Sequence, residues 1–314
     1  MELTRYVAPC DRQDVLKLWG DIFGEDEAAL EKPQLNGTEV EENLDILYVA
    51  SEDGVILGTI HATIPRLVPT ICGLSGMCTT LESRGKGIGR ILFSKIVEEI
   101  DGLGIQAAFL GTGNPIAAKL YKSMGFSFLP GSNVMFRSLK GDIVDYTRST
   151  YSAVSHEITI EHGSPNMRIP LIPLVLHQNG QIVLDCNTNL VSSNYMTQYS
   201  CMGLYPRYIA IKNNGGDFWG AINEVNVLGA VSSVLPTERG MRADFFCCDT
   251  FRCAVPKLID KCREKYGPVY LEIAASDTVK QIIAKEMGFH STFQSEITIR
   301  NFQIPTIIYE ASCF

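Results

Sequence analysis

Residues 83–90, SRGKGIGR, place three glycines at alternate positions between two arginines, directly before a periodic apolar segment. Glycine allows the backbone to turn sharply and leaves its N–H groups accessible. A helix that begins immediately after such a loop adds unpaired N–H groups and the positive end of its dipole. The cationic side chains strengthen this site, which suits a phosphate or pyrophosphate. The predicted anion site comprises Arg84, Gly85, Lys86, Gly87, Ile88, Gly89 and Arg90.

Two familiar nucleotide-binding loops do not match this segment. A Walker A loop has Gly-Lys followed by Ser or Thr, whereas Lys86 is followed by Gly87. The dinucleotide fingerprint Gly-x-Gly-x-x-Gly also differs, because the chain reads Gly-x-Gly-x-Gly-Arg from Gly85. A tight strand-to-helix turn that holds no ligand stays open as the simpler interpretation of the loop alone.

The elements expected around the loop alternate between strands and helices. Residues 46–64 are rich in β-branched side chains around a Glu-Asp-Gly turn and predict a β-hairpin, and residues 70–80 predict a third strand. Apolar residues then recur every four positions from Ile88 to Ile100 and predict a helix with one apolar stripe.

A second strand and helix follow this first pair. Residues 105–111 predict a buried strand, Asn114-Pro115 has the form of a helix start, and Gly125 has the form of a helix end. The order strand, loop, helix, strand, helix predicts an α/β fold with a crossover between neighbouring parallel strands.

Two segments of the first half carry a family resemblance. Residues 84–89 resemble the Arg/Gln-x-x-Gly-x-Gly/Ala signature of the GNAT N-acetyltransferase superfamily. Residues 114–126, NPIAAKLYKSMGF, resemble the family's later segment Asn-x-x-Ala-x-x-Leu-Tyr-x-x-x-Gly-Phe. One departure is Leu81, where members often carry a proline. The resemblance covers residues 1–140 and implies a mixed central sheet flanked by helices.

The resemblance implies acetyl-CoA as co-substrate, with its pyrophosphate on the glycine-rich loop and no metal. The acyl-pantetheine arm would then lie along the backbone of Met77, Cys78 and Thr79, as an added strand would. Tyr121 would be the general acid, because a phenol is protonated at neutral pH; a core aromatic is the alternative. Asn114 would bind the coenzyme or only cap its helix.

The general base has several candidates. Glu82 lies at the start of the loop and His61 lies on a predicted strand, but a solvated carboxylate and a satisfied strand histidine are the simpler interpretations. The C-terminal carboxylate of Phe314 is a further candidate. The acidic stretch 24–45 lies where such folds place substrate-contacting helices, although a solvated face is the simpler interpretation.

The second half repeats the first at a constant offset of 163 positions, as in the pairs Gly104/Gly267, Gly125/Gly288 and Arg137/Arg300. Such a spacing predicts duplication. Residues 84–89 then fall on residues 247–252, which contain no glycine, and Tyr121 falls on Ala284. We therefore expect a catalytic domain at 1–140, a linker at 141–153 and a degenerate GNAT-like domain at 154–314 that completes the substrate pocket or the core between the halves.

Composition excludes several other classes. The 314 residues carry a net charge of -8 and no lysine- or arginine-rich run, which argues against nucleic acid or an anionic membrane as partner. Neither a signal peptide nor a membrane span is recognised, so we expect a cytoplasmic protein. The spacing of Cys247, Cys248, Cys253 and Cys262 matches no zinc pattern, so a metal site there is not favoured.

The sequence thus predicts an N-acetyltransferase that moves the acetyl group of acetyl-CoA to a small-molecule amine by direct attack in a ternary complex. Two alternatives stay open. One is a non-catalytic acyl-CoA-binding or regulatory protein. The other is an acyltransferase that uses a peptide or carrier-protein acceptor, or a longer acyl donor.

Overall fold

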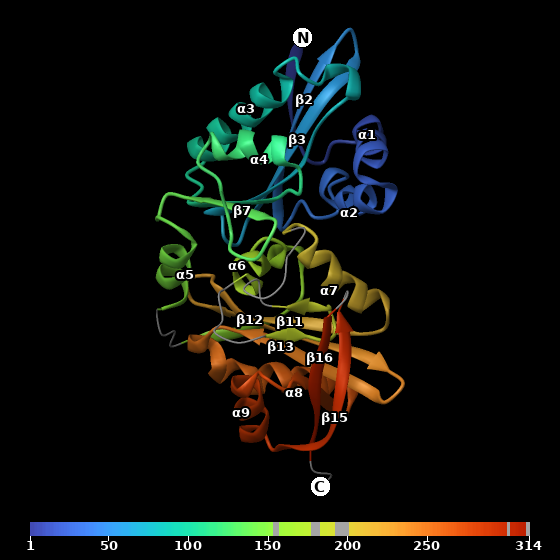
Figure 1. The fold of residues 1–314 in the computed structure, drawn as a ribbon, viewed down its shortest axis with the longest axis vertical. Coiled ribbons are helices and arrows are strands. Elements are labelled where there is room, and N and C mark those ends of the chain that lie inside the picture. The colour runs from blue at the N-terminus through green and yellow to red at the C-terminus, as the bar shows by residue number, and fades with distance from the viewer. Residues whose placement is uncertain (153–156, 177–182, 192–200, 300–301, 312–314) are drawn as a thin grey trace.

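The computed structural model describes residues 1–152, 157–176, 183–191, 201–299 and 302–311. Two seven-stranded sheets lie one after the other along the long axis of the molecule, each with helices beside it (Figure 1). The first sheet uses strands between residues 2 and 138, and the second uses strands between 158 and 311. The predicted tandem α/β fold is therefore confirmed, while the domain boundaries stay a prediction.

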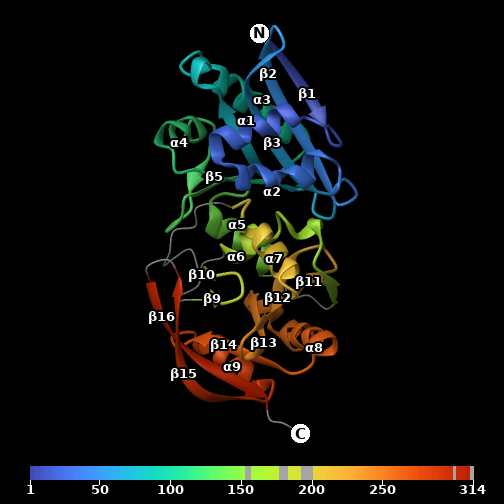
Figure 2. The same ribbon diagram turned by 90° about the vertical axis from the view of Figure 1, so that its right-hand side faces the viewer.

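The first sheet has the order β1-β2-β3-β4-β5-β7-β6, and only β4 and β5 are parallel. Helices α3 and α4 lie on one side of it, and α1 and α2 lie on the other (Figures 1 and 2). The strands are β1 (Glu2–Val7), β2 (Asn43–Glu52), β3 (Val55–Pro65), β4 (Ile71–Thr79), β5 (Ala107–Gly111), β6 (Ser127–Phe128) and β7 (Val134–Ser138). The helices are α1 (Gln13–Phe23), α2 (Glu25–Leu35), α3 (Ile88–Gly102) and α4 (Pro115–Lys122).

Local sequence signals account for most of these elements. The hairpin β2–β3 turns at Asp53 and Gly54, which both have positive φ. The apolar stripe of α3, from Ile88 to Ile100, is buried in one core cluster with residues of β3 and β4. The side chain of Asn114 caps α4 by accepting hydrogen bonds from two backbone N–H groups of its first turn.

A wedge opens in the middle of the first sheet. Strands β4 and β5 pair only between Ile71–Gly73 and Ala107–Phe109, and diverge beyond that point. A β-bulge at Gly76, with φ +57°, bends β4 just after the divergence. Trp19 packs on this glycine so closely that a Cβ there would lie 2.3 Å from the ring. The bulge therefore needs glycine both for its backbone conformation and for space.

The second sheet has the order β8-β11-β12-β13-β14-β16-β15, which repeats the first strand for strand, with β13 and β14 as the parallel pair. This confirms the repetition predicted from the sequence. Its strands are β8 (Ile158–His162), β11 (Asp217–Asn223), β12 (Leu228–Thr237), β13 (Gly240–Cys247), β14 (Val269–Ala274), β15 (Phe289–Ile299) and β16 (Phe302–Ala311). Its helices are α6 (Leu171–Val175), α7 (Leu204–Asn213), α8 (Val255–Tyr266) and α9 (Thr278–Glu286), and a short hairpin joins β9 (Leu184–Asp185) to β10 (Leu190–Val191).

The two halves share one hydrophobic core. A helix, α5 (Ile143–Tyr151), lies within the predicted linker and packs on β7, with Tyr146 against Phe136. A single buried cluster joins Phe109 of the first sheet to Met167 and Tyr208 of the second half. A buried ion pair between Glu39 and Arg168 also crosses the junction. The second half therefore packs directly beneath the first sheet, as predicted for a copy that completes the core.

Candidate active site

The glycine-rich loop ends in an uncapped helix. Gly85 and Gly87 have φ of +77° and +80°, and α3 begins at Ile88 without a side-chain cap. In the described part of the chain, the backbone N–H groups of residues 85–88 donate to no other group. These N–H groups and the positive end of the α3 dipole can hold an anion. The local structure therefore fits the predicted phosphate site.

The side chains of the loop surround this helix end. Arg84, Lys86 and Arg90 are all exposed and add positive charge to the same region. Glu82 lies in the preceding 3-10 turn, Leu81–Ser83, and is exposed as well. Gly89 lies against β4, because a Cβ there would be 3.2 Å from the end of Met77. The loop and the wedge between β4 and β5 are thus directly adjacent.

The edge of β4 that faces the wedge is open. In the described chain, no strand pairs with this edge beyond Gly73. Met77, Cys78 and Thr79 follow the bulge, and on their other side Cys78 and Thr79 pair with β3. The Cys78 thiol lies 3.3 Å from Thr59 Oγ1 on the α1 side, so its side chain points away from the loop. The backbone groups along this edge of β4 are therefore available to another extended group, and their contact with a pantetheine arm stays a prediction.

A cavity of about 170 Å³ fills the wedge. Its walls include Met77 from β4, Leu110 from β5, and Asn114 and Tyr121 from the α4 region. Tyr121 is buried, with its ring 4.5 Å from that of Phe93. Burial, followed by the nearby Cys78 thiol, raises the pKa of Tyr121 above its ordinary value. The phenol is therefore protonated at neutral pH and can donate a hydrogen bond into the cavity.

The structure bears on the two interpretations that the sequence left open for Tyr121 and for Asn114. Tyr121 is a core aromatic and a cavity-lining group at once. Asn114 Oδ1 accepts from the N–H groups of Ile116 at 2.9 Å and Ala117 at 3.4 Å, so it caps α4. Asn114 also lines the wedge cavity, and its contact with a coenzyme stays a prediction.

A second cavity of about 470 Å³ adjoins the first, and the two share Leu74, Ser75 and Gly76 of β4 together with Phe23 and Gly111. Helices α1 and α2 supply one wall, which contains Trp19 and Glu31. The opposite wall comes from the second half, where Met202, Gly203 and Pro206 lie at the start of α7. A molecule in the larger cavity could therefore meet a group in the wedge cavity at Ser75.

Glu31 is the most constrained carboxylate of the larger cavity. Its Oε2 accepts a hydrogen bond from Ser75 at 2.8 Å and lies 3.4 Å from His61 Nδ1. Burial alone would raise the pKa of Glu31, but the hydrogen bond and charge of His61 outweigh it and lower the pKa. Glu31 is therefore ionised at neutral pH and can attract a cation into the cavity.

His61 lies beneath this carboxylate and is fully buried. Its Nε2 is 3.1 Å from Asp45 Oδ1, and its Nδ1 is 3.0 Å from Ser75 Oγ. Burial alone would lower the pKa of His61, but Asp45 and Glu31 raise it to about 9. The imidazole is thus charged at neutral pH, which favours a role in holding Glu31 over the predicted role of general base.

The other candidate bases lie elsewhere. Glu82 is exposed on the 3-10 turn and belongs to neither cavity wall as far as the structure describes them. Phe314 lies outside the described residues. Of the two candidates that the structure describes, Glu82 lines neither cavity and His61 is held in its charged form, so the base assignment stays a prediction.

Glu31 and Ser75 were not singled out from the sequence. The acidic stretch 24–45 was interpreted as a solvated face, and α2 does expose most of its charges, but Glu31 turns toward the cavity. The available signal was the spacing of Glu27 and Glu31, which lie four residues apart and both line the cavity. Residues at this spacing share one face of a helix.

Two further features concern metals and membranes. Among the described residues, no group of three or more His, Cys, Asp or Glu side chains could hold a metal ion. In that same part of the chain, no helix combines the length and apolar character that a membrane crossing needs. Cys248 and Cys262 belong to two different core clusters, so they do not converge on one site.

Comparison with known proteins identifies the first half. Residues 12–126 match the family model described as Acetyltransferase (GNAT) family. No curated protein matches the chain. The match to the family model covers the glycine-rich loop, the wedge and Tyr121, and it confirms the family predicted for this half.

Several solved structures are similar to part of the chain. An IAA acetyltransferase from Bacillus cereus is 21% identical and covers 44% of this chain and 100% of its own, with a TM-score of 0.33. A mutant spermidine N-acetyltransferase from Vibrio cholerae is 13% identical, covers 48% and 91%, and has a TM-score of 0.37. A ribosomal-protein-alanine N-acetyltransferase from Brucella melitensis is 14% identical, covers 48% and 97%, and has a TM-score of 0.36. These values carry no conclusion on the acceptor of this chain.

Proposed function

Because residues 12–126 form a domain of the acetyltransferase (GNAT) family, we propose that this chain transfers the acetyl group of acetyl-CoA to a small-molecule amine by direct attack in a ternary complex. The observation that carries the proposal is the pair of cavities that meet at Ser75 and Gly76 of β4. One cavity leads to the glycine-rich loop and the other is lined by carboxylates. Two substrates, one in each cavity, can therefore approach each other at this shared wall.

The donor side fits coenzyme A by its chemistry. The exposed N–H groups of residues 85–88 and the three neighbouring cations suit the pyrophosphate. The open edge of β4 beyond Gly73 suits the amide groups of the pantetheine arm, which would bind there as a strand does. When bound, acetyl-CoA supplies an activated thioester to the end of the wedge. The residues present thus match the parts of this co-substrate in order along the wedge.

Tyr121 provides the proton for the departing thiolate. It lines the wedge cavity, and its raised pKa keeps the phenol protonated at neutral pH. Because the Tyr121 side chain lines the wedge cavity, its hydroxyl can donate to a group bound there. General acid catalysis of this kind contributes about 10²- to 10⁴-fold in rate.

The acceptor side favours a small cation. The cavity of about 470 Å³ has the volume of a small-molecule site, and the start of α7 closes it opposite α2. Trp19 and Met202 provide apolar surface, whereas Glu27 and Glu31 provide negative charge. An ammonium group near Glu31 would be held close to Ser75, where the wedge begins. The nucleophile is the neutral amine, so the acceptor loses a proton before attack.

The test is an assay of free coenzyme A thiol over a panel of amines, with Tyr121→Phe as the variant. The wild-type chain should release thiol only when an amine is present. Tyr121→Phe should lower kcat by about 100-fold and leave the KM for acetyl-CoA nearly unchanged, because packing on Phe93 is kept. Tyr146→Phe changes another buried tyrosine, which packs on Phe136 and lines neither of the two cavities; it is the matched control and should retain full activity. Unchanged turnover in Tyr121→Phe would remove Tyr121 from the mechanism.

The alternatives are outcomes of the same assay. Binding of acetyl-CoA without thiol release across the panel would favour a non-catalytic acyl-CoA-binding protein. Release with peptides or a carrier protein but not with small amines would favour a macromolecular acceptor. Faster release from longer acyl thioesters would favour a different donor.

A further inference from the structure

The second half contains a wedge at the same place in its sheet as the first. Strands β13 and β14 pair only between Met241–Ala243 and Val269–Leu271, and then diverge. Both strands continue, β13 to Cys247 and β14 to Ala274, each with a partner only on its outer side in the described chain. The equivalent wedge of the first sheet is the proposed coenzyme cleft. The question is what lies in the second wedge.

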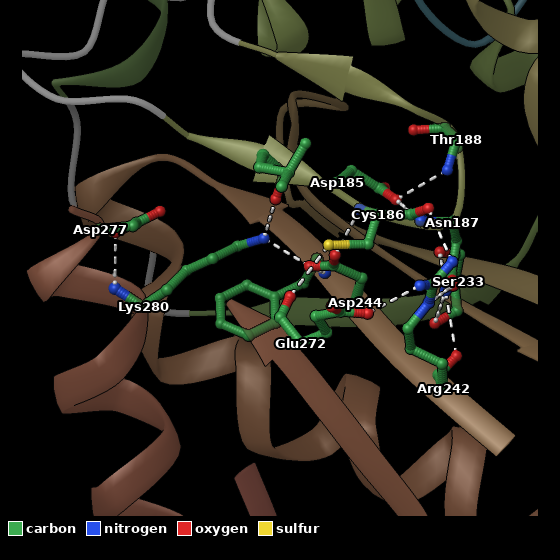
Figure 3. Close-up of polar contacts among 12 residues, drawn as sticks. Asp185, Cys186, Asn187, Thr188, Ser233, Arg242, Asp244, Glu272, Asp277 and Lys280 are labelled. Carbon is green, nitrogen blue, oxygen red and sulfur yellow. Dashed lines mark hydrogen bonds and ion pairs between the residues drawn. The ribbon is translucent and has the colours of Figure 1, made fainter. Parts of the chain in front are cut away.

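The hairpin β9–β10 lies against it and contacts β13 (Figure 3). The backbone N–H of Cys186 donates to Asp244 Oδ2 at 2.6 Å, and the thiol of Cys186 donates to the carbonyl of Glu272 at 3.1 Å. Arg242 Nη2 donates to the carbonyl of Cys186 at 2.8 Å. The hairpin is therefore bonded to both diverging strands, to β13 through the side chains of Asp244 and Arg242 and to β14 through the carbonyl of Glu272.

The side chains of the two wedges differ accordingly. The first residues beyond the paired region are Leu74 and Leu110 in the first wedge, and Asp244 and Glu272 in the second. These acidic side chains are buried, and Lys280 of α9 forms an ion pair with Asp244. The second wedge thus holds charges that only a fixed polar partner can satisfy.

Lys280 connects this charge to the hairpin. Its Nζ also donates to the backbone carbonyl of Leu184 at 2.5 Å, and Figure 3 shows its side chain reaching from α9 toward the hairpin. The cavity that remains beside Lys280 is about 50 Å³, compared with about 170 Å³ in the first wedge. Removing the hairpin would leave Lys280 and Asp244 buried with fewer partners. The hairpin is therefore a permanent part of the fold rather than a reversible cover.

The hairpin also holds α7, which forms a wall of the acceptor cavity. Arg207 of α7 donates from Nη1 to the carbonyls of Thr188 at 2.8 Å and Asn189 at 3.3 Å. The hydroxyl of Tyr208 donates to Asp185 Oδ2 at 3.3 Å. Pro206, which directly precedes Arg207 on α7, and Gly203, the N-cap residue of this helix, line the 470 Å³ cavity. The hairpin therefore contacts α7, and α7 in turn forms part of the wall of the acceptor cavity.

We infer that the second half binds no coenzyme because the hairpin β9–β10 fills its cleft, and that this hairpin positions α7 as the second-half wall of the acceptor cavity. The second half then acts in acceptor selection, and Arg207 and Tyr208 are positioning residues. The part of the inference that concerns the acceptor rests on the proposed function. The part that concerns the filled cleft does not.

The first experiment counts coenzyme sites by calorimetry with acetyl-CoA on the full chain and on Gly87→Glu. The wild-type chain should bind one molecule, and Gly87→Glu should bind none, because the added carboxylate repels the pyrophosphate at the loop. Two molecules per wild-type chain, or one on Gly87→Glu, would overturn the inference. No binding to either chain would refute the donor site of the proposed function, and it would agree with a filled second cleft.

The second experiment measures the KM for the amine and the KM for acetyl-CoA separately. Arg207→Ala and Tyr208→Phe should each raise the KM for the amine, by about ten-fold for Arg207→Ala, and leave the KM for acetyl-CoA unchanged. Tyr208→Phe removes only a hydroxyl, so it tests the contact even where Arg207→Ala lowers stability. Arg263→Ala, on α8 with an exposed partner in Asp260, is the matched control and should change neither constant. An unchanged amine KM in both test variants would refute the role of the hairpin, as would an equal rise in both constants.

Discussion

At the residue scale, the acceptor cavity depends on one carboxylate whose charge is set by its neighbours. Ser75 and His61 both face Glu31 Oε2, and Asp45 holds His61 from the other side. Because His61 lies 3.4 Å from Glu31 and 3.1 Å from Asp45, the charged forms of Glu31 and His61 stabilise each other. A histidine held in its charged form is a poor proton acceptor, whereas an ionised glutamate at a cavity wall is a good partner for an ammonium group.

Glu31→Gln tests the attraction of a cationic acceptor. Glutamine keeps the size of the side chain and an oxygen that can accept from Ser75, but it removes the negative charge. The KM for the amine should rise about ten-fold, with the KM for acetyl-CoA unchanged, because a charge-assisted contact is lost only on the acceptor side. Steady-state kinetics with each substrate varied would measure this. Glu98→Gln, an exposed glutamate of α3 paired with Lys95, is the control. An equal amine KM in Glu31→Gln and the control would contradict the assignment.

His61 predicts a pH dependence of stability. Its pKa rises from 6.5 to about 9 on folding, because Asp45 and Glu31 outweigh the effect of burial. A group with a raised pKa stabilises the fold fully below its unfolded pKa, and this stabilisation is lost as pH rises through the folded pKa. The contribution is on the order of 3 kcal/mol.

The comparison is between wild type and His61→Gln, unfolded in urea at several pH values. The difference in free energy of unfolding between them should be largest near pH 6 and should shrink steadily toward about pH 9. His290→Gln, an exposed histidine, should match wild type throughout. A constant difference between wild type and His61→Gln across this range would show that His61 does not carry the charge.

At the element scale, the sequence predicted what local signals determine. The hairpin of β2 and β3, the apolar stripe of α3 and the cap of α4 each depend on residues close together in the chain, and each is confirmed. The hairpin β9–β10 was not predicted, because its partners Asp244 and Glu272 lie far away in sequence. For the same reason the inward turn of Glu31 was missed, since it depends on His61 across the sheet.

Asn114 gives a prediction for the element that presents Tyr121. Asn114→Ala removes the cap of α4 and should lower the free energy of unfolding by about 1 kcal/mol, whereas Asn114→Ser keeps a capping oxygen and should lose less. Urea unfolding measures both. Equal stability of Asn114→Ala and wild type would contradict the capping role. A rise in the KM for acetyl-CoA in both variants would support the coenzyme contact as well.

At the scale of the whole molecule, the sequence predicted the repetition of the fold and a core between the halves, but not the residues that form that core. The offset of 163 positions relates the β5–α4 region to the β14–α9 region, and the two sheets share one strand order. How the copies pack depends on surfaces that diverged after duplication, such as Met167 and Ile169 beneath the first sheet. The two copies therefore differ at the same place in the sheet. The wedge between β4 and β5 is open, whereas the hairpin β9–β10 covers the wedge between β13 and β14.

The last prediction concerns the buried ion pair at the junction between the two halves. Arg168 from the second half pairs with Glu39 from the first, both are buried, and the guanidinium lies 4.6 Å from the centre of the Tyr205 ring. Arg168→Met leaves Glu39 buried without its cation and should lower the free energy of unfolding by roughly 3 to 5 kcal/mol.

Two further variants make this test specific. Lys261→Ala, which removes an exposed ion pair with Glu264, should cost less than about 1 kcal/mol. Combining Arg168→Met with Glu39→Met removes both buried charges and should recover part of the loss, because the penalty comes from the unpaired carboxylate. If Arg168→Met costs no more than Lys261→Ala in urea unfolding, the ion pair does not join the halves. If instead the double variant is less stable than Arg168→Met, the loss comes from packing around Tyr205 rather than from charge.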